Sequence, residues 1–246
     1  MQIKVGSRTF APSLPATLLA LVGIVAVSHL GVWQLHRAAE KQAILDQIEA
    51  GEATTHTLTA DAAALQRYQT VTATGHYDVA HQVLLDNMPS LQGMPGYRVL
   101  TPFELSTGGW VLVDRGWLPM GPTRATLPAI EVEAHERTIV GRLDEVPRPG
   151  MRLGSPPRGE GWPRVLNFPQ LADLERELDR KLAPWIVRLD PAQSDGYERS
   201  FVMRPDFGPN RHIAYAVQWF ALALTMLVVY VVVNLKRNRH DDTGTT

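Results

Sequence analysis

Residues 209–235 read PNRHIAYAVQWFALALTMLVVYVVVNL and decide the fold of this chain. No Asp, Glu, Lys or Arg follows Arg211 until Lys236, so the 23 residues from Ile213 onward carry no formal charge. At about 1.5 Å per residue, a helix of this length covers roughly 34 Å, enough to cross the hydrocarbon core of a bilayer with some tilt. We therefore predict a transmembrane helix over residues 212–235.

A second apolar stretch, residues 14–35, lies near the other end of the chain. With two spans, the intervening residues 36–211 must lie together on one side of the membrane. The first stretch could instead be a cleaved signal peptide, because Ala26-Val27-Ser28 resembles a cleavage site. The apolar run continues past that site, and Trp33 stands where an interfacial aromatic residue belongs, so a retained anchor is favoured.

Basic residues flank both spans on the side of the short tails, residues 1–13 and 236–246. They are Lys4, Arg8, Lys236, Arg237 and Arg239. Because short segments rich in Lys and Arg stay in the cytoplasm, we expect both termini to be cytoplasmic. Residues 36–211 would then form the periplasmic domain of a multi-pass protein in a bacterial inner (plasma) membrane.

The composition argues against several classes of protein. With 24 basic and 25 acidic residues, the chain shows no electrostatic sign of nucleic-acid binding. It has no cysteine, which rules out disulfides, C-x-x-C-H haem attachment, thiolate copper sites and cysteine nucleophiles. Nucleophile-elbow, P-loop, dinucleotide-binding and H-E-x-x-H motifs are also missing, so we do not expect an enzyme.

The region between the spans predicts an α+β domain. Short β-branched and aromatic runs separated by Gly and Pro predict a mainly antiparallel sheet that can close into a barrel. One amphipathic helix is expected at residues 169–182, with Leu171, Leu174, Leu178 and Leu182 on a single core-facing stripe. The predicted strands are residues 70–77, 82–86, 97–105, 110–115, 137–143, 164–168 and 184–189.

Two further helical segments are expected before the sheet. Residues 36–50 are rich in good helix formers and extend the first span outward until Gly51. Thr59 and Asp61 offer N-caps for a short helix that reaches Arg67.

The Gly and Pro residues between and within the predicted strands also indicate local structure. Residues 106–109, Ser-Thr-Gly-Gly, read as a hairpin loop between two apolar runs. Pro102 in the first of these runs predicts an edge strand or a bulge, because proline cannot donate to a ladder. Residues 147–163 are dense in Pro and Gly and predict a mobile surface loop.

Histidines inside the spans are the candidate site, because ionisable groups at membrane depth are rare and usually functional. His29, Trp33 and His36 follow the i, i+4, i+7 rule and share one helix face. His212, Tyr215 and Trp219 form a similar stripe in the second span. Both stripes lie toward the outward ends of their helices, so an antiparallel pair could bring them together around haem, with imidazole on the iron.

Simpler roles exist for these residues. Trp33, Tyr215 and Trp219 can be interfacial belt residues, and His36 can contact lipid headgroups. Gln34 and Gln218 are polar groups within the spans, and hydrogen bonding between helices is the role expected of them.

Four blocks of sequence resemble the surfeit locus protein one (Shy-type) family of cytochrome c oxidase assembly factors. They are residues 30–45 (LGVWQLHRAAEKQAIL), 92–105 (QGMPGYRVLTPFEL), 109–119 (GWVLVDRGWLP) and 210–223 (NRHIAYAVQWFALA). The blocks occur in the family's order and cover both spans and the central hairpin. The resemblance implies an inner-membrane factor that binds or delivers haem a for insertion into oxidase subunit I, with haem A synthase as a partner.

The resemblance also assigns residues. The family's histidine in the second span corresponds to His212, which becomes the tentative ligand of the haem iron. Matches to the first span are Trp33, Gln34 and Arg37, and matches to the central blocks are Gly96, Tyr97, Thr101, Pro102, Phe103, Arg115, Gly116 and Trp117. His29 is not part of the family pattern, so a two-histidine site is an inference from spacing alone.

Arg115 has two readings, a haem propionate partner or a buried structural bond, since its planar fork suits carboxylates. The same two roles, propionate partner or structural residue, are expected for Arg37. Asp114 stands where the family often has Asn, and neighbouring residues of a strand point to opposite faces, so no Asp114–Arg115 salt bridge is expected.

Two other functions stay open. The protein could be a scaffold that binds no haem and stabilises an assembly intermediate of subunit I. It could also be a membrane-tethered periplasmic enzyme, which would require a cluster of acids and histidines that the sequence spacing does not predict. In all three cases the lipid bilayer is a partner and nucleic acid is not.

Overall fold

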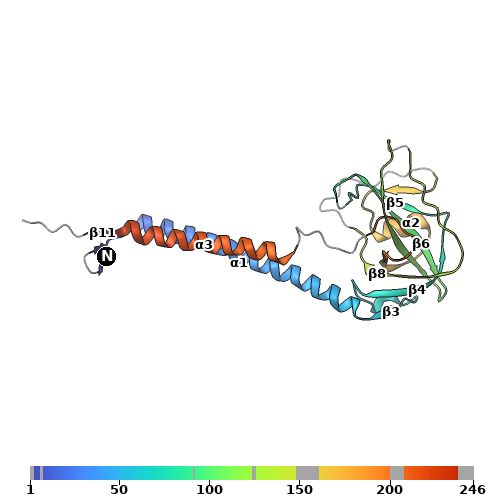
Figure 1. Cartoon of the computed structure of the whole chain (residues 1–246), viewed down its shortest axis with the longest axis horizontal. Coiled ribbons are helices and arrows are strands. Elements are labelled where there is room, and N and C mark those ends of the chain that lie inside the picture. The colour runs from blue at the N-terminus through green and yellow to red at the C-terminus, as the bar shows by residue number, and fades with distance from the viewer. Residues whose placement is uncertain are drawn as a thin grey trace, which may run out of the picture. The chain divides into compact units, whose positions relative to one another are not determined.

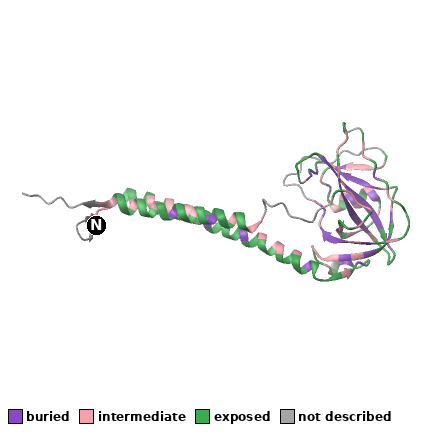
Figure 2. Ribbon diagram, in the orientation of Figure 1, coloured by how far each residue is buried: buried purple, intermediate pink, exposed green. Residues whose placement is uncertain are grey.

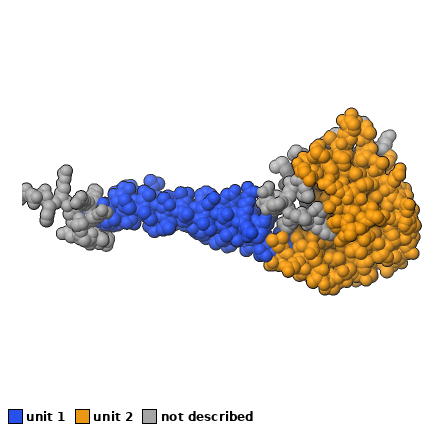
Figure 3. Space-filling model, viewed as in Figure 1, with its two compact units in different colours: residues 1–44, 203–246 blue, residues 45–202 orange. Residues whose placement is uncertain are grey.

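The computed structural model describes residues 3–5, 8–90, 92–123, 126–147, 161–199 and 208–237. The chain divides into two compact units, residues 1–44 with 203–246 and residues 45–202 (Figure 3). The predicted surface loop at 147–163 lies mostly outside the described residues.

The first unit is built on two long helices, α1 (Leu14–Glu52) and α3 (Pro209–Asn234) (Figure 1). The last turns of α1, from Leu45 on, belong to the second unit. Short strands β1 (Ile3–Val5), β2 (Arg8–Phe10) and β11 (Leu235–Arg237) form an antiparallel sheet in which β2 is central. The predicted extension of the first span beyond residue 35 is confirmed, because one helix continues to Glu52.

Both helices are long and apolar enough to cross a membrane, with mean hydropathy of 2.0 and 2.2 over their most apolar windows. A core helix of a soluble protein would bury such side chains. Here they are mostly exposed (Figure 2), with Leu19 at 76% and Val233 at 71%. Because so much apolar surface is unstable in water, the unit associates with a membrane.

Small residues let α1 and α3 approach each other closely. A Cβ added at Gly31 would lie 2.8 Å from the Phe220 ring, and one at Gly23 would collide with Met226. Ala38, Ala216 and Ala223 are the buried alanines of these two helices. This is the small-residue packing by which transmembrane helices associate, since hydrophobic burial gives no driving force inside lipid.

The second unit contains a closed five-stranded barrel with the order β4-β8-β10-β7-β6, in which β6 pairs with β4 to close the ring. Four of the five pairings are antiparallel, and β7–β10 is parallel. One parallel pair is unavoidable, because an odd number of strands cannot alternate direction around a closed ring. The strands are β4 (Thr70–Tyr77), β6 (Gly96–Leu105), β7 (Trp110–Pro119), β8 (Arg137–Asp144) and β10 (Leu182–Leu189).

Three short strands extend the barrel. β3 (Thr55–Thr57) pairs in parallel with β4, and β5 (Val83–Leu85) joins β6 and carries β9 (Arg164–Leu166) on its other edge. The prediction of an α+β domain with a mainly antiparallel, barrel-like sheet is therefore confirmed.

Both faces of the barrel wall are covered. Val111 and Val113 of β7 belong to the inner core cluster, whereas Leu112 between them belongs to a second cluster under α2 (Leu171–Leu178). Successive residues of a strand point to opposite faces, so burial on both sides makes β7 continuously buried from Val111 to Trp117. This explains why Val111, Leu112 and Val113 are consecutive apolar residues and do not alternate with polar ones.

Two helix predictions were too long. The helix expected to reach Leu182 ends at Leu178, where Asp179 adopts a left-handed conformation (φ 49°), and Leu182 begins β10. Leu182 still packs against the cluster that contains Leu174 and Leu178. The prediction that these leucines face the core is therefore confirmed, although Leu182 is not part of the helix. The helix expected between Thr59 and Arg67 is a single 3-10 turn, Ala62–Ala64, whose preceding Asp61 makes no capping bond.

Pro102 is not at an edge. It lies in β6 opposite Leu112, at the point where the other side of β6 changes its partner from β5 to β4. The missing N–H costs no ladder bond at this change of partner. The hairpin loop is confirmed, with Gly108 and Gly109 at positive φ and a Gly108 N–H bond to Leu105 O.

Candidate functional site

A polar contact between the two long helices joins His212 to Gln34. Nδ1 of His212 lies 2.8 Å from Oε1 of Gln34, and both side chains are partly buried. Because an amide oxygen only accepts, Nδ1 is the donor in this contact, and in a neutral imidazole Nε2 then keeps its lone pair. The contact supplies the interhelical role expected of Gln34 and orients the imidazole ring.

The first-span stripe does not meet His212. At about 100° per residue, His29, Trp33 and His36 lie roughly 140–160° around α1 from Gly31, the residue that faces α3. All three are exposed, Trp33 at 48%. The helix pair therefore leaves two separate stripes and does not form the joint site that the spacing allowed.

Most of the other candidates in the helices are peripheral. Tyr215 is exposed, with the Arg211 guanidinium 6.0 Å from its ring centroid, while Trp219 is partly buried. Gln218 is exposed, on the side of α3 away from Ala216 and Ala223. Arg37 lies 6.0 Å from the Trp33 ring centroid and pairs with Glu40 at 2.6 Å.

Arg115 is the centre of a buried network in the barrel unit. Its side chain is 2% exposed, and each guanidinium nitrogen donates to a protein acceptor. The best of these bonds go to Asp195 O from Nε (2.8 Å), to Gln82 Oε1 from Nη1 (3.0 Å) and to Glu131 O from Nη2 (2.9 Å). This geometry fits the structural reading of Arg115, and its propionate reading stays a prediction.

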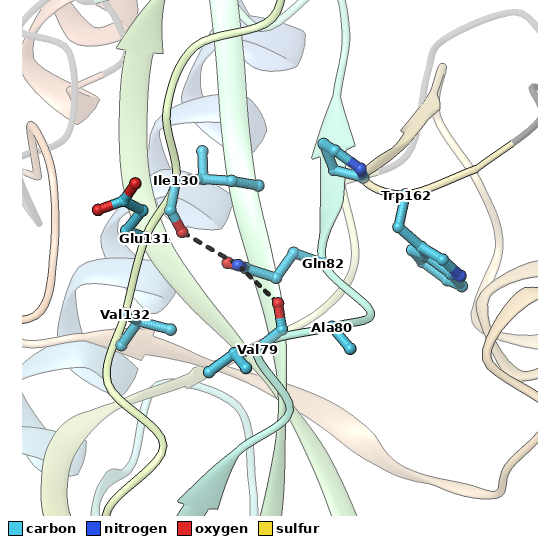
Figure 4. Close-up of a pocket in the computed structure, with 8 residues that line it drawn as sticks. Val79, Ala80, Gln82, Ile130, Glu131, Val132 and Trp162 are labelled. Atoms are coloured by element: carbon cyan, nitrogen blue, oxygen red, sulfur yellow. Dashed lines mark hydrogen bonds between the residues drawn. The ribbon is translucent and has the colours of Figure 1, made fainter.

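Gln82 links the network to an open pocket of about 300 Å³ (Figure 4). Its amide nitrogen donates to the carbonyls of Val79 and Ile130, while its oxygen accepts from Thr101 and Arg115. The amide therefore uses both of its ends and leaves no group free for chemistry. The remaining lining residues are Ala80, Glu131, Val132, Trp162 and Pro163.

Asp114 pairs with Arg98 and not with its neighbour Arg115. Nε of Arg98 lies 2.7 Å from Oδ2 of Asp114, which is 2% exposed. The other carboxylate oxygen accepts from Gly116 N at 3.1 Å. This is the separation expected for adjacent residues on a strand.

Acids and histidines elsewhere form pairs rather than a catalytic cluster. Nδ1 of His81 lies 2.8 Å from Oδ2 of Asp78, which also accepts from Arg180. Burial alone would raise the pKa of Asp78, but the hydrogen bond and charge of His81, together with the charge of Arg180, hold that pKa below its usual range. Within the described ranges, no three His, Cys, Asp or Glu side chains could share a metal ion.

Several residues of these networks carried no sequence signal. Gln82 bonds to Arg115 from the residue before β5, and the Trp117–Glu198 bridge places the segment that contains Arg199 beside β7. Tyr77 of β4 has the Arg115 guanidinium 5.6 Å from its ring centroid, and nothing in the sequence spacing of these residues relates them to Arg115. Gln34 could be found from sequence, since a polar residue within an apolar span requires a partner.

Comparison with protein families matches residues 21–224 to the SURF1 family. The match covers most of α1, the whole barrel and the first part of α3, as far as residue 224. The chain belongs to the SURF1 family.

Individual SURF1 relatives agree with this assignment along most of their length. A SURF1-like protein of Rickettsia felis is 24% identical over 223 residues, which cover 89% of this chain and 96% of the relative. A SURF1-like protein of Rickettsia conorii is 25% identical over 228 residues, with 89% and 91% covered. An uncharacterized SURF1-like protein of Mycobacterium bovis is 28% identical over 185 residues, with 72% and 65% covered.

All the candidate residues lie within the region matched to the SURF1 family, from His29 in α1 to Trp219 in α3. At this level of identity the match supports the family and the arrangement of its parts. It assigns no role to a single side chain.

Proposed function

We propose that this protein is a biogenesis factor for cytochrome c oxidase that binds haem a and delivers it for insertion into subunit I. Family membership, two membrane helices and a histidine between them support this proposal. The observation that carries it is the contact of His212 with Gln34. A partly buried, oriented imidazole with one free nitrogen is a group that haem proteins use on the iron.

The residues would supply one protein ligand to a haem iron. With Nδ1 bound to Gln34, His212 would ligate iron through Nε2, while Tyr215 and Trp219 on the same helix would offer aromatic surface to a macrocycle. Haem supplies the iron and the porphyrin, and the chain supplies orientation and an apolar surrounding. His29, His36 and Trp33 lie on the opposite face of α1, so we assign them no contact with a ligand held by His212.

The visible spectrum of the protein, purified in mild detergent from cells that also make haem A, tests this proposal. We expect a haem a Soret band in the wild type and its loss in His212→Ala, with equal amounts of protein. His36→Ala serves as a matched control, because its imidazole is exposed and away from α3. A colourless wild type, or a band that survives in His212→Ala, would refute His212 ligation.

Gln34→Leu tests the orientation of the ligand separately from its presence. Without the Nδ1 acceptor, we expect His212 to bind haem more weakly by about 10-fold, the lower end of the range for lost outer-shell hydrogen bonds. The change should also shift the Soret maximum, while Gln218→Leu on the outer face of α3 should do neither. Haem titration into the detergent-purified apoprotein gives both readouts, and equal affinity in Gln34→Leu and wild type would exclude a positioning role.

The second candidate function is a scaffold that carries no haem and stabilises an intermediate of subunit I. One observation favours it: the helix pair supplies a single oriented histidine, and the other stripe points away. A scaffold should still co-purify with subunit I after His212→Ala, whereas a haem carrier should lose haem from the assembled oxidase. In neither case, haem carrier or scaffold, do we expect the protein to be an enzyme.

The proposed location is a bacterial inner membrane, with both tails in the cytoplasm and the barrel unit in the periplasm. The partners are then the bilayer, oxidase subunit I and haem A synthase as the source of haem a. Basic residues beyond both helices support this orientation.

A further inference from the structure

The two tails of the chain meet in the small sheet of β1, β2 and β11, which we call the tail sheet. Residues 11–13 alone separate β2 from the start of α1, and β11 begins at the residue after α3 ends (Figure 1). The backbone N–H of Ala11 donates to Asn234 O at 3.0 Å, which joins the two tails beside the sheet. The tail sheet therefore adjoins the ends of both long helices, within the same compact unit.

Aromatic residues mark the membrane interface at this end of the helices. The rings of Phe10 and Tyr230 make an edge contact, with centroids 6.0 Å apart. The Tyr230 hydroxyl lies 2.8 Å from Oγ1 of Thr17. Because tyrosine concentrates where hydrocarbon meets headgroups, the end of the tail sheet that contains Phe10 lies at this boundary when α1 and α3 span the membrane as proposed.

The strand register divides the tail sheet into three rows at increasing distance from the helices. The row nearest the helices is apolar and contains Ile3, Phe10 and Leu235. The second row contains Lys4, Thr9 and Lys236, and the last contains Val5, Arg8 and Arg237. At about 3.3 Å per residue the last row lies roughly 7 Å beyond the first, which is comparable with the depth of a headgroup layer.

The last row brings two like charges together. Arg8 of β2 is directly opposite Arg237 of β11. The Cβ atoms of residues in such positions are about 4.5–5.5 Å apart, and like charges there destabilise a sheet. The sequence offers no acid nearby, because the first acidic residue of the chain is Glu40 and the first after α3 is Asp241. The pairing of β2 with β11 is therefore more favourable when an anion lies between the two arginines.

We propose that the tail sheet binds an anionic phospholipid, whose headgroup phosphate is shared by Arg8 and Arg237. The planar guanidinium group suits phosphate oxygens, and a phosphodiester has oxygens enough for two arginines. Lys4 and Lys236 in the adjacent row add positive charge, so a lipid with a net negative charge is favoured over zwitterionic phosphatidylcholine. A headgroup phosphate is also the anion that a bilayer supplies at this level.

Native mass spectrometry of the full-length protein in mild nonionic detergent, titrated with phosphatidylglycerol, tests the proposal. We expect the wild type to bind phosphatidylglycerol several-fold more tightly than phosphatidylcholine. Arg8→Gln and Arg237→Gln should each weaken phosphatidylglycerol binding by about fivefold, the usual weight of one basic residue at an anionic membrane surface. Equal affinity in the wild type and the double variant, or no preference for phosphatidylglycerol, overturns the proposal.

Arg176→Gln is the matched control for the loss of one charge. Arg176 is an exposed arginine of α2 in the barrel unit, with a side chain that is 62% accessible. Its substitution should leave phosphatidylglycerol binding unchanged. A loss equal to that of Arg8→Gln would show that the lipid responds to net charge alone, which also overturns the proposed site.

Disulfide formation between Phe10→Cys and Leu235→Cys tests the pairing of the two tails. These residues are direct partners in β2 and β11, and the chain has no cysteine of its own. In vesicles of equal parts phosphatidylglycerol and phosphatidylcholine, we expect a larger disulfide fraction than in pure phosphatidylcholine, because the lipid phosphate relieves the repulsion between the arginines. The difference should vanish when Arg8→Gln and Arg237→Gln are added. No disulfide in either vesicle, or equal fractions in both, contradicts the proposal.

Inorganic phosphate distinguishes a lipid site from a site for soluble phosphate. It offers similar oxygens but no acyl chains, so it should not displace phosphatidylglycerol from the wild type when added at the concentration of the lipid. Displacement at that concentration overturns the assignment to lipid. These measurements use no haem, and their outcome is independent of the spectrum of the His212 variants.

Discussion

At the scale of single residues, Asp114 depends on a partner 16 positions away in the sequence, Arg98 in the neighbouring strand. We predict that Arg98→Met destabilises the barrel by about 3–5 kcal/mol, because it leaves a buried carboxylate without its cation. Asp114→Asn should cost less, about 1–2 kcal/mol, since an amide keeps an acceptor for Gly116 N and Arg98 is partly accessible to water. Urea unfolding followed by tryptophan fluorescence measures both, and a smaller loss for Arg98→Met than for Asp114→Asn would contradict this account.

Asp78 gives the barrel a dependence on acid pH. Its pKa in the folded state is held below the ordinary value of about 3.9, so its contribution to stability is complete above roughly pH 4. The contribution is lost as the pH falls through the folded pKa. We predict that the unfolding temperature of the wild type drops more steeply below pH 4 than that of Asp78→Asn, and parallel curves would exclude the ion pairs of Asp78 as the cause.

At the scale of elements, the pair α1–α3 depends on its glycines. Gly31→Leu forces a side chain into the Phe220 ring and should separate the helices. The chain has no cysteine, so cysteines introduced at Thr17 and Tyr230, whose hydroxyls lie 2.8 Å apart, can be joined by a short bis-maleimide without background. We expect Gly31→Leu to reduce the cross-linked fraction several-fold.

Val22→Leu is the control for this experiment, because Val22 is 65% exposed on the surface assigned to lipid. It adds volume without meeting α3, so its cross-linking should equal that of the parent. Equal cross-linking in Gly31→Leu would show that the close approach at Gly31 does not hold the pair together.

The strands and helices were predictable to different degrees. β4 was predicted residue for residue, since Thr70–Tyr77 combines β-branched and aromatic residues between turn signals. The strand predicted at residues 110–115 is too short, because β7 continues to Pro119. In the structure Gly116 takes φ +112° against the backbone of residues 197 and 198, and the strand continues to Pro119.

At the scale of the whole molecule, we predict that the barrel unit lies in the periplasm and both tails lie in the cytoplasm. We expect a cysteine at Thr107, in the barrel's hairpin loop, to react with a membrane-impermeant maleimide added to spheroplasts. A cysteine at Asp241, in the tail after α3, should react only after the membrane is permeabilised. The reverse pattern would place the barrel in the cytoplasm.

The sequence by itself determined the plan of this protein: two apolar spans, a strand-rich unit between them and the family to which they belong. These properties follow from local composition and periodicity, which act over the length of one element. Only the tertiary structure decided which side chains meet. It joined His212 to Gln34 and turned His29, Trp33 and His36 away, because the glycines of α1 fix which of its faces meets α3. The barrel likewise brought Tyr77 of β4 next to Arg115 of β7, and the Trp117–Glu198 bridge placed residues 197–199 beside β7. Such contacts depend on strand register and on long-range pairing, which no local pattern records.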